Sequence, residues 1–234
     1  MTRASAEERA WLHQTLPRIE GFLSDHEAAY LYDLAAFGPG DGAIVEIGSF
    51  AGKSTVVLAR AAQLHGRERV TAIDPFKGGN SPAFRANLEA AGVTDQVVPL
   101  VARSEEVALE WREPVRLLWI DGKHRYEQVH LDFARWAPHV VDGGVIAFHD
   151  TFKFQGVRRV VDDEVAPDGR YAIIGVVDSI TAFRKLEGSV PALRFRRRIL
   201  TTGRALCATT GPFRARGGFK RQTRRLMRRL STTE

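Results

Sequence analysis

The chain has 234 residues, of which 44% are apolar and 26% are charged, and Cys207 is its single cysteine. This length suffices for one substantial buried core, a single cysteine excludes an intrachain disulfide, and no stretch is apolar for long enough to span a bilayer. The N-terminus lacks the apolar segment of a signal peptide. We therefore expect a cytoplasmic protein in a reducing compartment.

The net charge of +6 divides unevenly along the chain. From residue 185 onward there are 14 lysines and arginines against two acids, a charge of +12, so the preceding residues carry −6. This asymmetry predicts an acidic folded domain followed by a basic tail. We expect a helical flank over residues 1–42, a catalytic domain over 43–187, and an amphipathic or disordered tail over 188–234.

The basic tail leaves two interpretations open. Apolar residues interleaved with its arginines suit peripheral contact with an anionic membrane surface, whereas the alternative is a solvated, disordered tail. Nucleic acid is a weaker alternative, because the preceding domain is acidic and shows no basic groove. We also expect a homo-oligomer.

Strands and helices are expected to alternate from residue 43 onward. Before that point we expect helices over 4–16 and from Ser24, which forms a capping box with Glu27. The expected strands are 43–48, 69–74, 96–101, 115–121, 144–148, 171–177 and 180–186, and the helices between them are 52–65, 81–91, 104–111, 125–137 and 156–165. This order predicts an α/β fold with a doubly wound, mostly parallel seven-stranded sheet and an antiparallel edge hairpin.

A glycine-containing turn, Gly48 to Gly52, joins the first strand to the following helix. Backbone N–H groups and the helix N-terminus at such a turn suit an anionic or polar ligand. Gly52-Lys53-Ser54 resembles the end of a nucleotide-binding P-loop, and Asp121 could then be the aspartate that holds magnesium. However, only three residues separate Gly48 from Gly52. The P-loop spacing needs four, so a nucleotide hydrolase or kinase is the weaker alternative.

S-adenosylmethionine is the stronger candidate ligand. An acidic residue, Glu46, comes just before the turn, and Asp74 lies at the end of the next strand. Asp74 follows Gly48 by 26 residues, which is about the distance at which nucleoside-binding folds place an acidic residue that binds the ribose. The G-x-G-x-x-G pattern of dinucleotide enzymes is absent. The candidate cofactor-binding residues are Glu46, Gly48, Ser49, Gly52, Ser54, Asp74 and Ser104.

The next two strand ends also carry polar groups. Asp121 and His124 follow the fourth strand, and His149 and Asp150 follow the fifth. Because the carboxyl ends of parallel strands share one edge, these groups should lie close together. Two carboxylates suit magnesium, and ligation by His149 would favour manganese or iron.

Residues 120–150 contain the pattern I-D-G-x-H-x-Y-E, then W-x-P and G-G, and finally H-D. This pattern resembles class I methyltransferases of the group that includes the macrocin and mycinamicin sugar O-methyltransferases and the cephalosporin hydroxylase-like proteins. The resemblance covers about residues 43–186. It implies the Rossmann-like methyltransferase fold and a divalent metal on Asp121 and Asp150, with His124 as the general base. This chain has His149 where that group has glutamate.

The resemblance implies a metal-dependent O-methyltransferase that aligns an acceptor hydroxyl of a sugar, glycoside, glycolipid or related small metabolite with the methyl group of S-adenosylmethionine. A non-catalytic or hydroxylase-like relative is a further alternative. Each residue also has a structural interpretation: Asp121 and Ser104 could cap the segments after them, and His124 could be an exposed loop residue. His149 could be a packed residue rather than a ligand.

Overall fold

The computed structural model describes residues 3–188, so the basic tail lies almost entirely outside the described residues. A seven-stranded sheet forms the centre, in the order β3-β2-β1-β4-β5-β7-β6. The first five strands run parallel, and β7 is antiparallel to both β5 and β6. The strands are β1 (Ala43–Ile47), β2 (Val70–Ile73), β3 (Val97–Leu100), β4 (Val115–Ile120), β5 (Val140–Phe148), β6 (Tyr171–Val177) and β7 (Ile180–Lys185).

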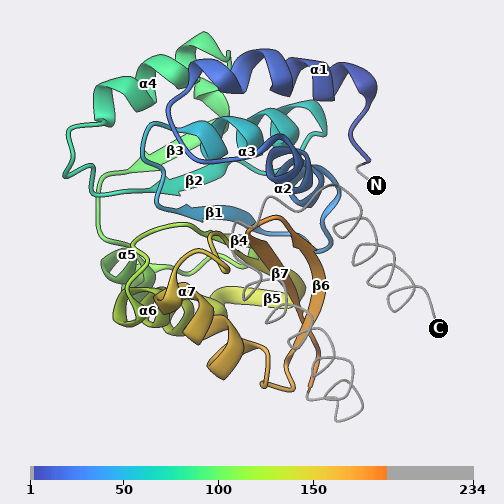
Figure 1. Ribbon diagram of the computed structural model, residues 1–234, viewed down its shortest axis with the longest axis vertical. Coiled ribbons are helices and arrows are strands. Elements are labelled where there is room, and N and C mark those ends of the chain that lie inside the picture. The colour runs from blue at the N-terminus through green and yellow to red at the C-terminus, as the bar shows by residue number, and fades with distance from the viewer. Residues whose placement is uncertain (1–2, 189–234) are drawn as a thin grey trace, which may run out of the picture.

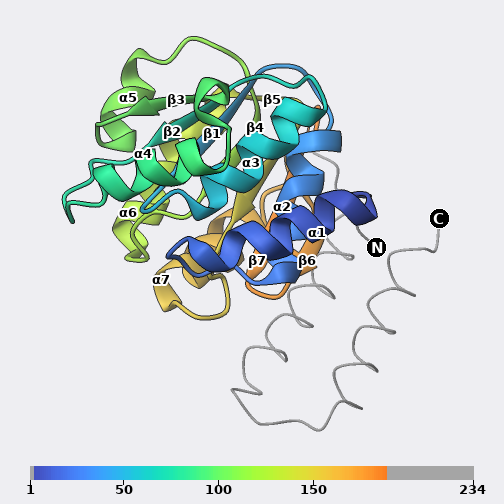
Figure 2. The ribbon, with the colours of Figure 1, turned by 90° about the horizontal axis from the view of Figure 1, so that it is seen from above.

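Helices cover both faces of the sheet, as the strand–helix alternation predicts. Figure 1 shows α1 to α4 on one face and α5 to α7 on the other, and Figure 2 shows the same layers from above. The helices are α1 (Ala6–Thr15), α2 (Asp25–Phe37), α3 (Lys53–Leu64), α4 (Ser81–Ala90), α5 (Ser104–Glu110), α6 (Tyr126–Trp136) and α7 (Gln155–Arg159). Among the residues with a described position, no helix is long and apolar enough to cross a membrane.

Alternating side chains of the central strands build two separate cores. On β4, Leu117 and Trp119 pack on the α1–α4 side, whereas Leu118 and Ile120 pack on the α5–α7 side, and all four are at most 3% exposed. Successive strand residues point to opposite faces, so a strand buried on both faces reads as a continuous apolar run. The expected fold is therefore confirmed.

Three local expectations differ from the structure. β5 begins at Val140 rather than at residue 144, because Gly143, with φ +82°, lies within an irregular stretch of the strand instead of before it. The helix expected over 156–165 is α7 followed by a π-helical stretch, Val160–Val165. Arg103, not Ser104, is the N-cap of α5, because the Ser104 hydroxyl donates to Asp132 on α6.

The N-terminal flank is built into the main core. Its second helix, α2, begins with the expected capping box of Ser24 and Glu27, and it buries Leu31 and Ala35 in the same core as α3. The first helix, α1, is attached by Glu8, whose carboxylate accepts a hydrogen bond from Tyr32 on α2 and lies 2.8 Å from His65 Nε2 at the end of α3.

Glu8→Gln should lower stability in a pH-dependent way. Burial would raise the pKa of Glu8, but hydrogen bonds from Tyr32, Ser5 and His65 outweigh it and lower the pKa from 4.5 to about 2. A carboxyl with a depressed folded pKa stabilises the protein above its unfolded pKa, and that contribution is lost as pH falls through the folded pKa. The substitution should therefore cost about 1–3 kcal/mol at pH 7, and the cost should shrink steadily below pH 4.5.

Urea unfolding across this pH range measures the difference between wild type and variant. The exposed neighbour Glu7 provides the control, because Glu7→Gln should change the unfolding free energy little at any pH. A cost for Glu8→Gln that stays constant down to pH 3 would contradict this account of Glu8.

Candidate active site

The turn after β1 approaches the end of β4 so closely that only glycine fits at its start. Gly48 has φ +88°, and a Cβ added there would lie 2.4 Å from the main-chain oxygen of Asp121. The next two residues, Ser49 and Phe50, turn their N–H groups to Asp74 Oδ2, each at 3.0 Å. Gly52, with φ +88°, then begins α3 as its N-cap. This turn therefore presents main-chain groups at the sheet edge.

Asp74 holds the turn in place from the end of β2. Besides the two bonds to its Oδ2, its Oδ1 accepts a hydrogen bond from the N–H of Phe76 at 2.6 Å. An ionised carboxylate offers about four acceptor positions, so one remains for a ligand hydroxyl. Asp74 therefore organises the turn, and its binding to a ribose stays a prediction.

Glu46 lies behind the turn rather than on its surface. Its side chain is completely buried, and it accepts a hydrogen bond from Thr55 in the first turn of α3. Burial raises the pKa of Glu46 to about 7, against the lowering effect of the Ser54, Thr55 and Ser49 hydroxyls. Glu46 therefore supports the turn from below, beside Ser54, which is also buried.

Asp121, His124 and Asp150 converge at the ends of β4 and β5. One ligand atom from each lies within 4.8 Å of the others. His124 Nε2 is 3.4 Å from Asp150 Oδ2 and 3.8 Å from Asp121 Oδ1, yet it has no partner in hydrogen-bonding geometry among the described residues. An oxygen–nitrogen–oxygen set of this kind suits a divalent cation.

Backbone conformation is unusual at the same edge. Among the described residues other than glycine, four have a positive φ: Phe50, Phe76, Asp150 and Asp178. The first three follow β1, β2 and β5 at the carboxyl edge. Such conformations cost energy and gather at functional sites, which supports this edge as the site.

His149 lies beneath the three converging residues and is only 3% exposed. Its Nδ1 is 3.1 Å from Asp121 Oδ1, and its Nε2 is 3.4 Å from Glu27 Oε2 on α2. Burial lowers the pKa of His149, but the bonds to Asp121 and Glu27 and the charge of Asp150 outweigh it and raise the pKa to about 10. Both ring nitrogens thus face carboxylates, and His149 is placed to hold Asp121 rather than to join the expected metal ligands.

Glu27 is a site residue that sequence reasoning missed, since its only signal was the capping box. Its carboxylate accepts hydrogen bonds from the N–H and Oγ of Ser179, at 2.8 and 2.6 Å, and from the N–H of Ser24 at 2.9 Å. Glu27 therefore connects α2, the β6–β7 turn and His149.

Glu27→Gln should destabilise the protein by about 1–3 kcal/mol, because a neutral amide cannot accept from all of these donors and leaves His149 without its second carboxylate. The free energy of urea unfolding measures this cost. Asp25→Asn is the matched control in the same helical turn, because the ion pair of Asp25 with His13 is largely exposed. Equal effects of the two substitutions would contradict the role given to Glu27.

Two other expected residues have different surroundings from those anticipated. Ser104 is 8% exposed and bonded to Asp132, and burial raises the pKa of Asp132 to about 6. Lys53, which a P-loop would direct at a phosphate, donates to the main-chain oxygen of Gly21 at 3.1 Å. This contact weakens the nucleotide interpretation of the turn.

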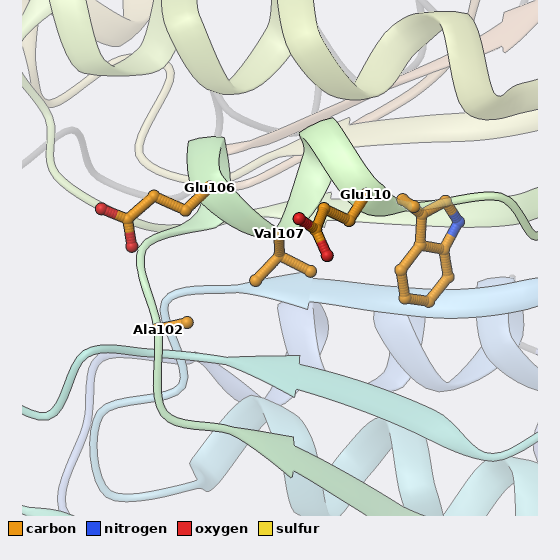
Figure 3. A pocket seen from close by; sticks show the side chains of 5 residues that line it. Ala102, Glu106, Val107 and Glu110 are labelled. Atoms are coloured by element: carbon orange, nitrogen blue, oxygen red, sulfur yellow. The ribbon is translucent and has the colours of Figure 1, made fainter.

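A cavity of about 410 Å³ lies beside α5, after the end of β3. Figure 3 shows Ala102 on the incoming loop and Val107 projecting from α5 toward the strands, with Glu106 and Glu110 along the same helix. None of the expected cofactor or metal residues lines this cavity. It is therefore separate from the residues that converge at β4 and β5.

Comparisons with known proteins point to the same sheet edge. The family model described as a methyltransferase domain matches residues 45–151, which run from the glycine turn to the residue after Asp150. These residues contain every expected cofactor, metal and catalytic residue, so the family match favours S-adenosylmethionine over a nucleotide as the ligand.

Several solved structures share the fold. They include the O-methyltransferase from Bacillus cereus in complex with SAH, at 20% identity over 78% of this chain and 93% of that chain, with a TM-score of 0.60. TomG from Streptomyces achromogenes, an O-methyltransferase of tomaymycin synthesis in complex with SAM, matches at 19% identity over 80% and 92%, with a TM-score of 0.59. CalS11, a TDP-rhamnose 3'-O-methyltransferase of calicheamicin biosynthesis, matches at 17% identity over 79% and 96%, with a TM-score of 0.54.

At these identities the structural likeness establishes the fold, and the family model adds the nature of the domain. The sheet order, the glycine turn over Asp74 and the match to residues 45–151 agree with one another. Residues 45–151 therefore match a methyltransferase domain, and the chain has the Rossmann-like fold of class I S-adenosylmethionine-dependent methyltransferases.

Proposed function

We propose that this methyltransferase transfers the methyl group of S-adenosylmethionine to a hydroxyl oxygen of a sugar, glycoside or related small metabolite, with the help of a divalent metal. The convergence of Asp121, His124 and Asp150 within 4.8 Å carries the proposal. An oxygen acceptor must lose a proton as it is methylated, and this group joins two carboxylates with an imidazole that can accept one. TomG and CalS11 are O-methyltransferases, which supports an oxygen acceptor, and CalS11 is a TDP-rhamnose 3'-O-methyltransferase, which supports a sugar.

The residues present fit a metal. Asp121 and Asp150 would hold it, since carboxylate oxygens suit magnesium, and ligation by His124 as well would favour manganese or iron. A bound divalent cation would lower the pKa of an acceptor hydroxyl and so ease its ionisation near neutral pH. His149, bridging Asp121 and Glu27, fixes the orientation of the Asp121 carboxylate.

Side chains and main-chain groups of the protein bind the methyl donor and remove the acceptor proton. The turn from Gly48 to Gly52 and the free acceptor position of Asp74 bind the methyl donor. His124, whose ring stacks on Phe154 with centroids 4.0 Å apart, is held with Nε2 toward the carboxylates, where it takes the acceptor proton. Holding both reactants in line supplies much of the acceleration.

The test is calorimetric titration of the full-length protein with S-adenosylmethionine, S-adenosylhomocysteine and ATP, each with magnesium and with chelator. We expect micromolar binding of the first two and none of ATP. Methyl transfer to hydroxylated sugars and glycosides is then screened with and without metal. Magnesium-dependent binding of ATP, without binding of the other two, would overturn the proposal.

His124→Gln distinguishes a base from a metal ligand. If His124 takes the proton, the variant should lose methyl transfer by about 10²–10⁴-fold while its affinity for Mn²⁺, measured by electron paramagnetic resonance, stays close to that of wild type. If His124 is a ligand, Mn²⁺ affinity should fall as well. Full activity in the variant would remove His124 from both roles.

The expected homo-oligomer and the contact of the basic tail with an anionic membrane stay predictions, as does the cytoplasmic location. Light scattering of the full-length protein tests the first. Sedimentation with phosphatidylserine vesicles tests the second, and we expect binding that weakens as salt is raised.

A further inference from the structure

A short loop with an exposed aromatic ring crosses the sheet edge next to the proposed site. The loop precedes α2, and Phe22 on it is 80% exposed. It is anchored by the bond from Lys53 to the Gly21 oxygen and by the Ser24 hydroxyl, which donates to Asp178 at 2.8 Å. A loop held at both ends thus presents a large apolar ring to solvent, where it is free to pack against the ring of a ligand.

Lys153 links this ring to the proposed base. Its Nζ lies 5.0 Å from the ring centroid of Phe22 and 5.1 Å from that of Phe154, and Phe154 stacks on His124 with the rings 8° from parallel. A cation within about 6 Å of a ring centre is attracted by the ring face. Phe22, Lys153, Phe154 and His124 therefore form one continuous row, which we call the aromatic–lysine row.

The charge of Lys153 is not neutralised by an acid. Within residues 3–188, no ion pair forms on this exposed lysine, whereas Arg116, Arg158 and Arg170 each pair with a carboxylate. The chain up to residue 184 nevertheless carries a net charge of −6, so acidic partners are abundant. An unpaired cation beside the base, on an acidic protein, is suited to attract a negatively charged ligand.

From this row we propose that the methyl acceptor carries an anionic group, a phosphate or a carboxylate, bound by Lys153, and a ring that packs against Phe22. This inference rests on the proposed function, since it names the class of acceptor that the site takes. The ring would lie along the aromatic–lysine row, with its hydroxyl directed toward His124 and its charged group at Lys153. Phosphate and carboxylate acceptors share this chemistry, and the experiment separates them.

The experiment measures the binding of matched charged and neutral probes to the full-length protein with saturating S-adenosylhomocysteine and magnesium. The carboxylate pair is protocatechuate and the corresponding dihydroxybenzamide, and the phosphate pair is glucose 1-phosphate and methyl α-glucoside. We expect the charged member of at least one pair to bind about tenfold more tightly or better, the gain typical of a charge-assisted hydrogen bond. Whichever pair shows the preference identifies the anionic group.

Lys153→Met should abolish the preference for the charged probe, because it keeps the apolar stem and removes the charge. Lys77→Met, which removes an exposed lysine of the loop after β2, should leave it unchanged. Phe22→Ala should weaken both members of a pair by similar factors. Melting temperatures and S-adenosylhomocysteine affinities that match wild type would show that the variants are folded.

Three results would overturn the inference: equal binding of charged and neutral probes, a preference that survives Lys153→Met, or no binding of either charged probe at millimolar concentration. S-adenosylhomocysteine binding is measured separately in the same protein. Its absence would contradict the proposed function and not the anion subsite, because the ratio of charged to neutral probe binding can still be read.

Discussion

Asp121→Asn should lower the rate of methyl transfer by about 10³-fold, the largest effect on activity that we expect from a single substitution. Asp121 is the first residue after β4, and its carboxylate faces His149 at 3.1 Å and His124 at 3.8 Å. The amide has nearly the same shape but no charge. It would weaken the metal site and leave the buried His149 facing one carboxylate fewer.

Binding of the methyl donor should survive this substitution. The Gly48–Gly52 turn is held by Asp74 on β2, and the Asp121 main chain, which bonds to Ile47 on β1, is unchanged in the variant. We therefore expect S-adenosylhomocysteine affinity within about threefold of wild type, whereas Mn²⁺ binding should be lost. Threefold corresponds to less than 1 kcal/mol.

The control for Asp121→Asn is Asp142→Asn, an exposed aspartate near the start of β5, away from the sheet edge that carries the site. It should leave turnover and both affinities unchanged. Normal turnover in Asp121→Asn would contradict the metal and positioning roles together. Loss of S-adenosylhomocysteine binding in that variant would show that Asp121 belongs to the donor site instead.

Arg116→Met should produce the largest loss of stability, about 2–4 kcal/mol. Arg116 lies on β4 and is completely buried at its side chain. Its Nε donates to Glu68 Oε2 at 2.7 Å, and its Nη2 donates to the main-chain oxygen of Ala35, in the last turns of α2, at 2.6 Å. Methionine fills much of the volume but leaves the helix oxygen without its donor and Glu68 with only the more distant Arg67, at 3.5 Å, as its counter-charge.

The loss should be seen as a fall in the free energy of urea unfolding and as a melting temperature roughly 5–15 °C lower for a chain of this size. Arg170→Met is the matched control, because Arg170 pairs with Asp168 but is 61% exposed, and an exposed pair contributes at most about 1 kcal/mol. Adding Glu68→Gln to Arg116→Met should recover part of the loss, since it removes a carboxylate that has lost its closer partner. Equal losses in the two arginine variants would contradict this account of Arg116.

Much of the architecture was predictable from local pattern. Buried parallel strands are short apolar runs, and the segments 43–48 and 115–121 read as such directly, so the order of elements and the edge hairpin followed. The ends of strands were less predictable where a turn-forming residue lies inside a strand. Gly143 resembles a turn residue but lies within β5, because an irregular strand tolerates a glycine with positive φ.

The residues at the carboxyl edge of the sheet were predictable from the sequence. Asp74, Asp121 and Asp150 each follow a strand directly, and parallel strands end at one edge, so their convergence required only the order of the elements.

Tertiary structure alone decided which side chains contact one another across long stretches of chain. Glu27 bonds to Ser179, 152 residues away, and Arg116 bonds to Glu68, 48 residues away. Ser104 donates to Asp132 instead of capping its helix, and His149 on the fifth strand end faces Glu27 on α2. Sequence periodicity records which face of an element is buried, but not which polar group on another element comes to that face. That pairing depends on the packing of helices and loops, which has no local signature.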